Sequence, residues 1–180
     1  MMSDAPRKVR PAWQCALVLV LVLAGTFLNG CTTRRTERVS IVPPRGVPSI
    51  WPIADADIRI TSRFGDRAAS PSGGFHPHRG IDIAAPKGTP VIATADGRVV
   101  CAQYNKGGYG KLVKIAHAGG IETWYAHLNS LDIKQDRRVG QGQRIGRVGK
   151  TGRATGFHVH YEVHINGAPV DPRSFLPSER

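Results

Sequence analysis

From Trp51 onward the sequence consists of short runs rich in Val, Ile, Thr and Tyr, separated by glycine-containing turns. The clearest runs cover residues 57–63, 97–104, 111–117 and 121–127. Runs of this length and composition are typical of strands in an antiparallel sheet, and no segment carries the apolar stripe of a long amphipathic helix. The sequence therefore predicts an all-β fold, in which glycine-rich turns connect the antiparallel sheets of a single compact domain.

The clearest hairpin joins residues 111–117 to residues 121–127 through Ala118, Gly119 and Gly120. Glycine adopts the positive φ angles that tight hairpin loops need, so this pair of runs predicts two adjacent antiparallel strands. The glycines between residues 140 and 156 fit turns and closely packed strands, because no phosphate-loop pattern occurs there in a suitable context. Nucleotide binding is therefore not expected.

The N-terminal residues follow the order of an export signal. Arg7, Lys8 and Arg10 precede an uncharged apolar run at residues 15–28. This run is shorter than the roughly 18 to 20 residues that a helix needs to cross a bilayer, so cleavage is favoured over a permanent transmembrane anchor. The chain is therefore expected to be exported.

The apolar run ends in Leu28-Asn29-Gly30-Cys31, which resembles a bacterial lipobox, with Asn29 in place of the usual small residue. The resemblance implies that residues 1–30 form a lipoprotein signal peptide and that Cys31 becomes the lipidated N-terminus. Several acyl chains would hold the protein stably on a membrane surface. Thr32 stands where an inner-membrane retention signal usually has Asp, which indicates the outer membrane, facing the periplasm, in a Gram-negative host. The alternative is an ordinary cleaved signal and a free secreted protein.

Residues 32–49 contain three prolines and four arginines and show no apolar periodicity. Residues 31–49, beginning with the lipidated Cys31, are therefore predicted to form a flexible tether. Residues 50–180 are predicted to form the folded domain. Cys101 would be the only unmodified cysteine of the mature chain, which excludes an internal disulfide. We interpret it as a small buried apolar residue rather than a reactive thiol.

The formal net charge of the chain is +12, which favours anionic neighbours. Export and the lack of a nucleic-acid-binding motif exclude nucleic acid as the expected partner. Anionic envelope polymers and lipid headgroups are better candidates, and the protein is expected to act as a monomer.

Two histidine clusters carry the candidate chemistry. In the first, His78 and Asp82 are separated by a short segment with a central glycine, so a turn can bring one nitrogen and one oxygen ligand together. In the second, His158 and His160 alternate along a strand-like run and point to the same side. Two histidines and one aspartate match an open catalytic zinc site, which has three protein ligands and one free position. Spacing alone does not distinguish His78 from His76.

Several further stretches resemble the lysostaphin-like, LytM-type family of zinc peptidases, and they occur in the family's order along the chain. The resemblance runs from Trp51 to about Leu176, which is most of the predicted mature protein. The matching stretches are Ser62-Arg63-Phe64-Gly65, His78 to Pro86, Tyr109-Gly110, Trp124-Tyr125-Ala126-His127-Leu128, Thr151-Gly152 to Thr155-Gly156, His158-Val159-His160, and Asn166-Gly167 to Val170-Asp171-Pro172.

This resemblance implies the LytM-type (duplicated hybrid motif) β fold and a zinc-dependent endopeptidase that hydrolyses peptide cross-links or stem-peptide amide bonds of bacterial peptidoglycan. It implies that His78, Asp82 and His160 bind Zn²⁺, while His127 and His158 are catalytic residues that act on the water and the developing oxyanion. Some domains of this type have lost metal ligands and act as non-catalytic activators of cell-wall amidases. Here all of these positions are filled. A structural lipoprotein that links membrane and wall is a third hypothesis.

The polar residues around these motifs leave some alternatives open. Glu162 is expected on the same face of the strand as His158 and His160. It is either an acceptor that orients a ligand ring or a solvated strand residue. His76 lies outside the matched motif and is expected to face solvent or substrate. His117 and His164 are expected to be structural, although His164 could approach the edge of the site.

Overall fold

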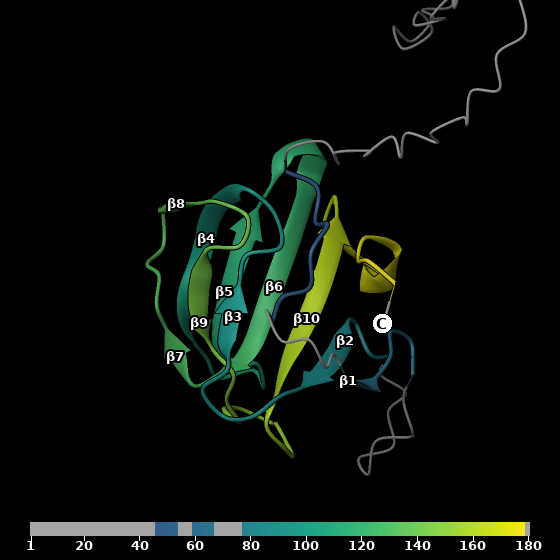
Figure 1. Cartoon of the computed structure of the whole chain (residues 1–180), viewed down its shortest axis with the longest axis vertical. Helices are drawn as coiled ribbons and strands as arrows, with labels where there is room; N and C mark the ends of the chain where they lie inside the picture. The colour runs from purple at the N-terminus through teal and green to yellow at the C-terminus, as the bar shows by residue number, and fades with distance from the viewer. Residues whose placement is uncertain (1–45, 54–58, 67–76, 179–180) are drawn as a thin grey trace, which may run out of the picture. The chain divides into compact units, whose positions relative to one another are not determined.

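The computed structural model of the protein describes residues 46–53, 59–66 and 77–178, all within one compact unit, Ile41–Arg180. The predicted signal peptide, Cys31, most of the predicted tether and His76 lie outside the described residues. Regular structure in the described part is almost entirely strand, which confirms the predicted all-β class (Figure 1). Within these ranges the structure contains no helix that is long and apolar enough to cross a membrane.

The larger layer is an antiparallel sheet in which β10 (His158–Ile165) lies between β2 (Ile81–Ala84) and β6 (Ile121–Leu128). The remaining strands of this sheet are β1 (Arg59–Ser62) beside β2, β5 (Gly110–Ala116), β4 (Gly97–Asn105) and β8 (Arg138–Val139) in that order beyond β6, and β11 (Ala168–Val170) beside β10. A smaller antiparallel sheet has the order β3 (Pro90–Ile92), β9 (Arg144–Arg147) and β7 (Ser130–Leu131). Two short 3₁₀ turns occur at Ala118–Gly120 and Pro172–Ser174.

The predicted hairpin is confirmed as β5 and β6, which pair antiparallel across the turn at Ala118–Gly120. Gly119 and Gly120 have φ angles of 71° and 72°, a region that residues with a Cβ atom rarely adopt. The run predicted at 57–63 contains β1, and the run predicted at 97–104 covers β4 except for its last residue, Asn105. Cys101 lies in β4 as a free thiol and is half-buried, so the prediction that it is buried is wrong.

The core lies between the two sheets, and the face of each strand that points into it is apolar. Ile81 and Ile83 of β2 and Val159 of β10 are fully buried in one cluster with Val91 of β3 and Ile145 of β9. Because side chains alternate along a strand, the residues between them point to the opposite face of the large sheet. That face carries Asp82 on β2 and the even-numbered residues of β10, which are His158, His160, Glu162 and His164.

Candidate metal centre and its cleft

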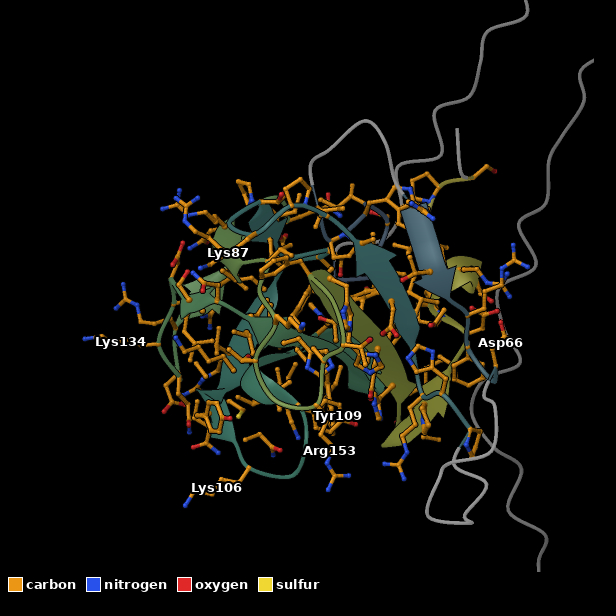
Figure 2. The ribbon with its side chains drawn as sticks, turned by 90° about the horizontal axis from the view of Figure 1, so that it is seen from below. Asp66, Lys87, Lys106, Tyr109, Lys134 and Arg153 are labelled. Carbon is orange, nitrogen blue, oxygen red and sulfur yellow. The ribbon has the colours of Figure 1, made fainter. Side chains whose placement is uncertain are left out.

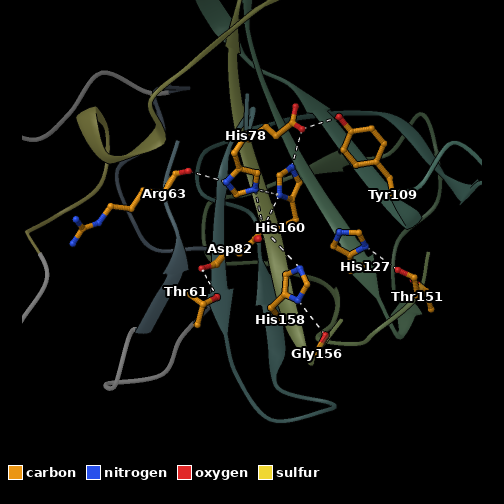
Figure 3. Close-up of polar contacts among 11 residues, drawn as sticks. Thr61, Arg63, His78, Asp82, Tyr109, His127, Thr151, Gly156, His158 and His160 are labelled. Carbon is orange, nitrogen blue, oxygen red and sulfur yellow. Dashed lines mark hydrogen bonds and ion pairs between the residues drawn. The ribbon is translucent and has the colours of Figure 1, made fainter. Parts of the chain in front are cut away.

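The strand register brings two of the predicted ligands side by side. His160 on β10 pairs directly with Asp82 on β2, and both side chains lie on the face opposite the core. His78 lies three residues before the start of β2, and its ring contacts both Asp82 and His160. The distances are 2.7 Å from His160 Nδ1 to Asp82 Oδ1, 3.1 Å from His78 Nε2 to Asp82 Oδ1, and 3.0 Å between the two ring nitrogens. Figure 3 shows these atoms converging.

The outer nitrogen of each ligand ring faces an oxygen acceptor. His78 Nδ1 lies 2.9 Å from the Arg63 carbonyl oxygen, and His160 Nε2 lies 2.8 Å from Glu162 Oε1. Each outer nitrogen therefore carries a proton, since an N–H must donate to these oxygens. The neutral rings then direct their lone pairs at each other and at Asp82. Only a positive charge between these three atoms, a proton or a metal ion, makes the arrangement favourable.

The cluster fits a metal ion of the zinc type. One ligand atom from each of His78, Asp82 and His160 lies within 4.8 Å of the other two. Ligand atoms at tetrahedral zinc distances lie roughly 3.3 Å apart, which is close to the observed separations. The side chains are 3% exposed for His78, 8% for His160 and 19% for Asp82, so the cluster opens on the carboxylate side. Two imidazoles, one carboxylate and an open side are the donor set of a catalytic zinc site.

The protonation of the metal-free cluster follows from the same contacts. Burial alone would raise the pKa of Asp82, but the hydrogen bonds of His160 and His78 outweigh it and hold that pKa well below its usual range. Burial would lower the pKa of His160, yet Asp82 and Glu162 raise it to about 9. The metal-free protein therefore keeps a proton on His160 at neutral pH. A metal ion must displace this proton, which makes metal affinity fall as the pH falls.

Glu162 is fully buried beside the cluster, which decides between its two interpretations. One of its carboxylate oxygens accepts from His160 Nε2 and from the Tyr109 hydroxyl, both at 2.8 Å. The other faces Nε2 of His164, whose ring stacks on Trp124 at 4.4 Å between centroids. Burial would raise the pKa of Glu162, but these donors lower it. Glu162 is thus the acceptor that orients a ligand ring, and the solvated interpretation is wrong.

His127 stands at the end of β6 in a backbone conformation that non-glycine residues rarely adopt, with φ of 60°. Its N–H donates to the Tyr109 carbonyl oxygen, and its ring Nδ1 lies 2.8 Å from the Thr151 carbonyl oxygen. Nε2 therefore carries the free lone pair and is the atom left to take a proton. Burial is the main reason why the pKa of His127 is lowered to about 4, so the ring is neutral at pH 7.

His158 completes the group beside the cluster. Its ring centroid lies 4.8 Å from that of His127, and its Nε2 is 3.8 Å from Asp82 Oδ1. Its Nδ1 lies 3.1 Å from the Gly156 carbonyl oxygen, so this nitrogen donates and Nε2 faces the cluster. His158 and His160 lie on the same face of β10, as the alternation in the sequence predicted.

These side chains line a cleft of about 690 Å³. One wall comes from the segment before β2, and the opposite wall comes from the turn between β4 and β5 and from the loop before β10. The lining residues are Pro77, His78, Arg79, Asp82, Gly107, Gly108, Tyr109, His127, Arg153, Thr155, His158, His160 and Glu162. Sequence reasoning missed the roles of Tyr109 and Arg153, although both stand in stretches that matched the family.

His117 lies away from this cleft. Its ring bridges the Asp96 carbonyl oxygen at 2.8 Å and the Thr123 hydroxyl at 2.7 Å, which agrees with the predicted structural role. His164 also keeps a structural position, because it reaches Glu162 but is not among the three clustered ligands. The predicted function of His76 falls outside the described residues.

Comparison with known sequences identifies the family. The sequence profile described as peptidase family M23 matches residues 76–172, which is more than half of the chain and contains every residue of the cluster. The chain belongs to peptidase family M23. This confirms the lysostaphin-like, LytM-type resemblance.

Relatives of known name agree with this assignment. The chain is 53% identical over 116 residues to the DD-carboxypeptidase/endopeptidase Mpg of Neisseria meningitidis, covering 64% of this chain and 26% of that protein. It is 44% identical over 117 residues to the peptidoglycan DD-endopeptidase ShyC of Vibrio cholerae, covering 64% and 27%. The chain spans about a quarter of the length of these relatives.

The fold of the M23 domain agrees as well. A crystal structure of a zinc-containing peptidase from Vibrio cholerae superposes with a TM-score of 0.65 at 37% identity. The match covers 71% of this chain and 39% of that one. The fold therefore agrees with the family that the sequence profile shows.

Proposed function

We propose that the protein is a zinc-dependent endopeptidase that hydrolyses peptide bonds of bacterial peptidoglycan. The observation that carries the proposal is the convergence of His78 Nε2, Asp82 Oδ1 and His160 Nδ1 at one side of an open cleft. Membership in a peptidase family and relatives named for peptidoglycan cleavage support the reaction and the substrate class.

In this proposal His78, Asp82 and His160 hold the zinc ion. When bound, zinc polarises the scissile carbonyl and lowers the pKa of a bound water toward about 7. His127, neutral and with Nε2 free, accepts the proton of the attacking water and later passes it to the leaving amine. His158 directs Nε2 at the same place and, when that nitrogen also carries a proton, donates to the carbonyl oxygen and stabilises the negative charge that develops there.

The test is digestion of purified peptidoglycan by the wild type and by His127→Ala, with mass analysis of the released fragments. We expect peptide fragments from the wild type and almost none from the variant, which should still bind zinc because His127 is not a ligand. Lys106→Gln, an exposed change on the turn beside the cleft, is the matched control and should leave activity unchanged. The fragment masses also identify the bond that is cut.

A zinc-loaded wild type that releases no fragment from any peptidoglycan would contradict the proposal. It would favour the alternative that the domain activates a separate cell-wall amidase without catalysis. That alternative makes a distinct prediction, because His158→Ala would then keep full cellular function. The complete set of histidines around an open metal cluster supports catalysis instead.

We also propose that the mature protein begins at a lipidated Cys31 and is held in the cell envelope, at the outer membrane of a Gram-negative host. The Leu28-Asn29-Gly30-Cys31 sequence after the apolar run supports this, and these residues lie outside the described structure. Fractionation of cells that express the wild type or Cys31→Ser tests it. The wild type should enter the membrane fraction, while the variant should lose acyl labelling; equal labelling of both would overturn the assignment.

A further inference from the structure

Two arginine side chains at the cleft mouth have no acidic partner among the residues that the structure describes. Arg79 and Arg153 both line the cleft, and both are exposed. Among the residues that the structure describes, salt bridges form at other arginines, such as Arg98 with Asp136 and Arg144 with Asp132, but none involves this pair. Within the described residues the two guanidinium groups therefore have no carboxylate partner, although Arg79 also hydrogen-bonds to Tyr109.

Arg153 is held at the cleft by the turn between β4 and β5. Its backbone N–H donates to the Gly108 carbonyl oxygen at 2.8 Å. Its aliphatic stem crosses Gly108 so closely that a Cβ at that position would lie 3.3 Å from Arg153 Cδ. Figure 2 shows its side chain beside Tyr109, with Lys106 projecting from another part of the same turn. The stem is thus supported while the charged end remains open.

Arg79 approaches the same turn from the opposite wall, between His78 and the start of β2. Its positive charge lies near enough to the Tyr109 hydroxyl to lower the pKa of that group, although burial and Glu162 raise it more. The Tyr109 hydroxyl donates to Glu162. Arg79 therefore reaches Tyr109, which directly follows Gly108 in the turn that supports Arg153, and all three line the cleft with the metal cluster.

The acidic side chains of the cleft are already engaged. Asp82 contacts His78 and His160, and Glu162 accepts from His160, His164 and Tyr109. Of the described side chains that line the cleft, the charged groups without an ion-pair partner are thus both positive, and a bound metal ion would add to them. A peptide that carries a negative charge near the scissile bond complements this arrangement.

We propose that Arg153, assisted by Arg79, binds a free carboxylate of the substrate next to the scissile bond. The domain would then select peptides with a carboxylate at this place over the same peptides with a carboxamide. A guanidinium group offers parallel N–H donors that match the two oxygens of a carboxylate, whereas a neutral amide offers one oxygen and no charge. The inference rests on the proposed peptidase function and specifies its substrate class.

The experiment uses the zinc-loaded full domain and two pairs of synthetic peptides around the cleavable bond. One pair has a chain-end carboxylate or its carboxamide, and the other has a side-chain carboxylate or its carboxamide. The wild type should prefer the carboxylate in at least one pair by about 10-fold or more in kcat/KM, mainly through KM. The pair that shows the preference identifies which carboxylate is bound.

Arg153→Gln should abolish the preference by slowing cleavage of the carboxylate peptide while leaving the carboxamide peptide nearly unchanged. Arg153→Lys keeps the charge but loses the paired donors, so it should restore part of the preference. Arg79→Gln should reduce the preference by a smaller factor. Lys106→Gln removes an exposed charge from the same turn and should not change the preference. Raising the salt concentration should weaken the preference in the wild type.

Equal cleavage of both members of each pair by the wild type would overturn the inference, as would a preference that survives in Arg153→Gln. Calorimetric binding of the same peptides separates this from a failure of the proposed function. Absent cleavage with a carboxylate preference in binding that Arg153→Gln removes would reject the peptidase activity and support the arginine site. Absent cleavage with equal binding would reject both.

Discussion

On one face of β10, His160 and Glu162 contact carboxylate and imidazole groups. On the other face Tyr161 lies in the apolar core, and its hydroxyl contacts the hydroxyl of Thr94. Tyr161 and Tyr125 are both fully buried, and their hydroxyls lie 2.9 Å and 3.0 Å from Thr94 Oγ1. Thr123 donates to Tyr125 at 3.0 Å. We call Thr94, Thr123, Tyr125 and Tyr161 the hydroxyl cluster.

The hydroxyl cluster needs no ion to balance it, although it also contacts the Thr94 N–H and the His117 ring. Each hydroxyl both donates and accepts, so the four side chains can satisfy one another without a net charge. Burial raises the pKa of Tyr125 and of Tyr161, which keeps both neutral. No buried side-chain nitrogen or oxygen in the described residues lacks a hydrogen-bond partner. The polar groups of this face therefore serve the packing of the core.

The face of β10 that carries His160, here called the histidine face, differs from the hydroxyl cluster. Once the outer ring nitrogens of His78 and His160 donate, their inner nitrogens and Asp82 Oδ1 are all acceptors. A proton or a metal ion must lie among His78, Asp82 and His160 to balance them. The same strand thus presents a neutral, closed network to the core and a charged, open network to the cleft. A network that needs a cation to balance its acceptors indicates a binding site. A network with a purely structural role can instead be built from hydroxyl groups, which satisfy one another.

The largest effect should follow from removing a ligand on the histidine face. Asp82→Ala should lose stoichiometric zinc and reduce kcat/KM well beyond the roughly 10- to 100-fold that loss of an outer partner costs. Metal analysis and peptidoglycan digestion measure both. Added zinc should raise the melting temperature of the wild type but not of this variant, because only the native site binds the ion. An Asp82→Ala protein with wild-type zinc content would break the comparison.

A smaller effect on zinc binding is expected from a change at Glu162, which contacts a ligand but is not one itself. Glu162→Gln keeps the size of the side chain but removes the charge that accepts from His160. We expect zinc affinity to fall by about 10- to 100-fold, measured by competition with a chelator. Circular dichroism should show an unchanged fold. Unaltered zinc affinity in a folded variant would show that Glu162 supports packing alone.

The equivalent change on the other face should affect stability alone. Tyr161→Phe removes one hydroxyl, and its partner Thr94 keeps the Tyr125 hydroxyl as a second contact. The expected cost is about 1 kcal/mol of unfolding free energy in urea, with zinc affinity and activity within about twofold of the wild type. Loss of zinc affinity here would show that the two faces are coupled through β10.

The smallest effect concerns pH and His117, which adjoins the hydroxyl cluster through Thr123. Burial lowers the pKa of His117 in the folded protein, although Asp96 opposes it. Below its ordinary value of 6.5 the unfolded chain therefore binds a proton that the folded chain resists. The contribution of His117 to stability is present above that pH and is lost as the pH falls toward the folded pKa.

The His117→Gln variant should therefore lose less unfolding free energy than the wild type when the pH is lowered from 7.5 to below 6.5. Urea unfolding of zinc-free wild type and variant at each pH measures the difference, in which the contributions of the other histidines cancel. A variant with the same pH dependence as the wild type would show that His117 does not titrate differently in the two states.

Much of the fold was predictable because it depends on local chemistry. The alternating and β-branched runs predicted the strands, and Gly119-Gly120 predicted the hairpin, since these signals act between neighbouring residues. Strand parity placed His158 and His160 on one face. Sequence spacing did not distinguish His78 from His76, and only the family resemblance chose between them.

Other features depended on contacts between residues far apart in the chain. The register of β2 and β10 sets His160 beside Asp82, and the depth of β10 in the sheet buries Glu162. The left-handed backbone of His127 is held by Tyr109 and Thr151, neither of which adjoins it in sequence. The sequence by itself determined the strands, the histidine spacing and the family. The tertiary structure decided which lone pairs meet, because hydrogen-bond partners and burial arise only when distant strands pack together.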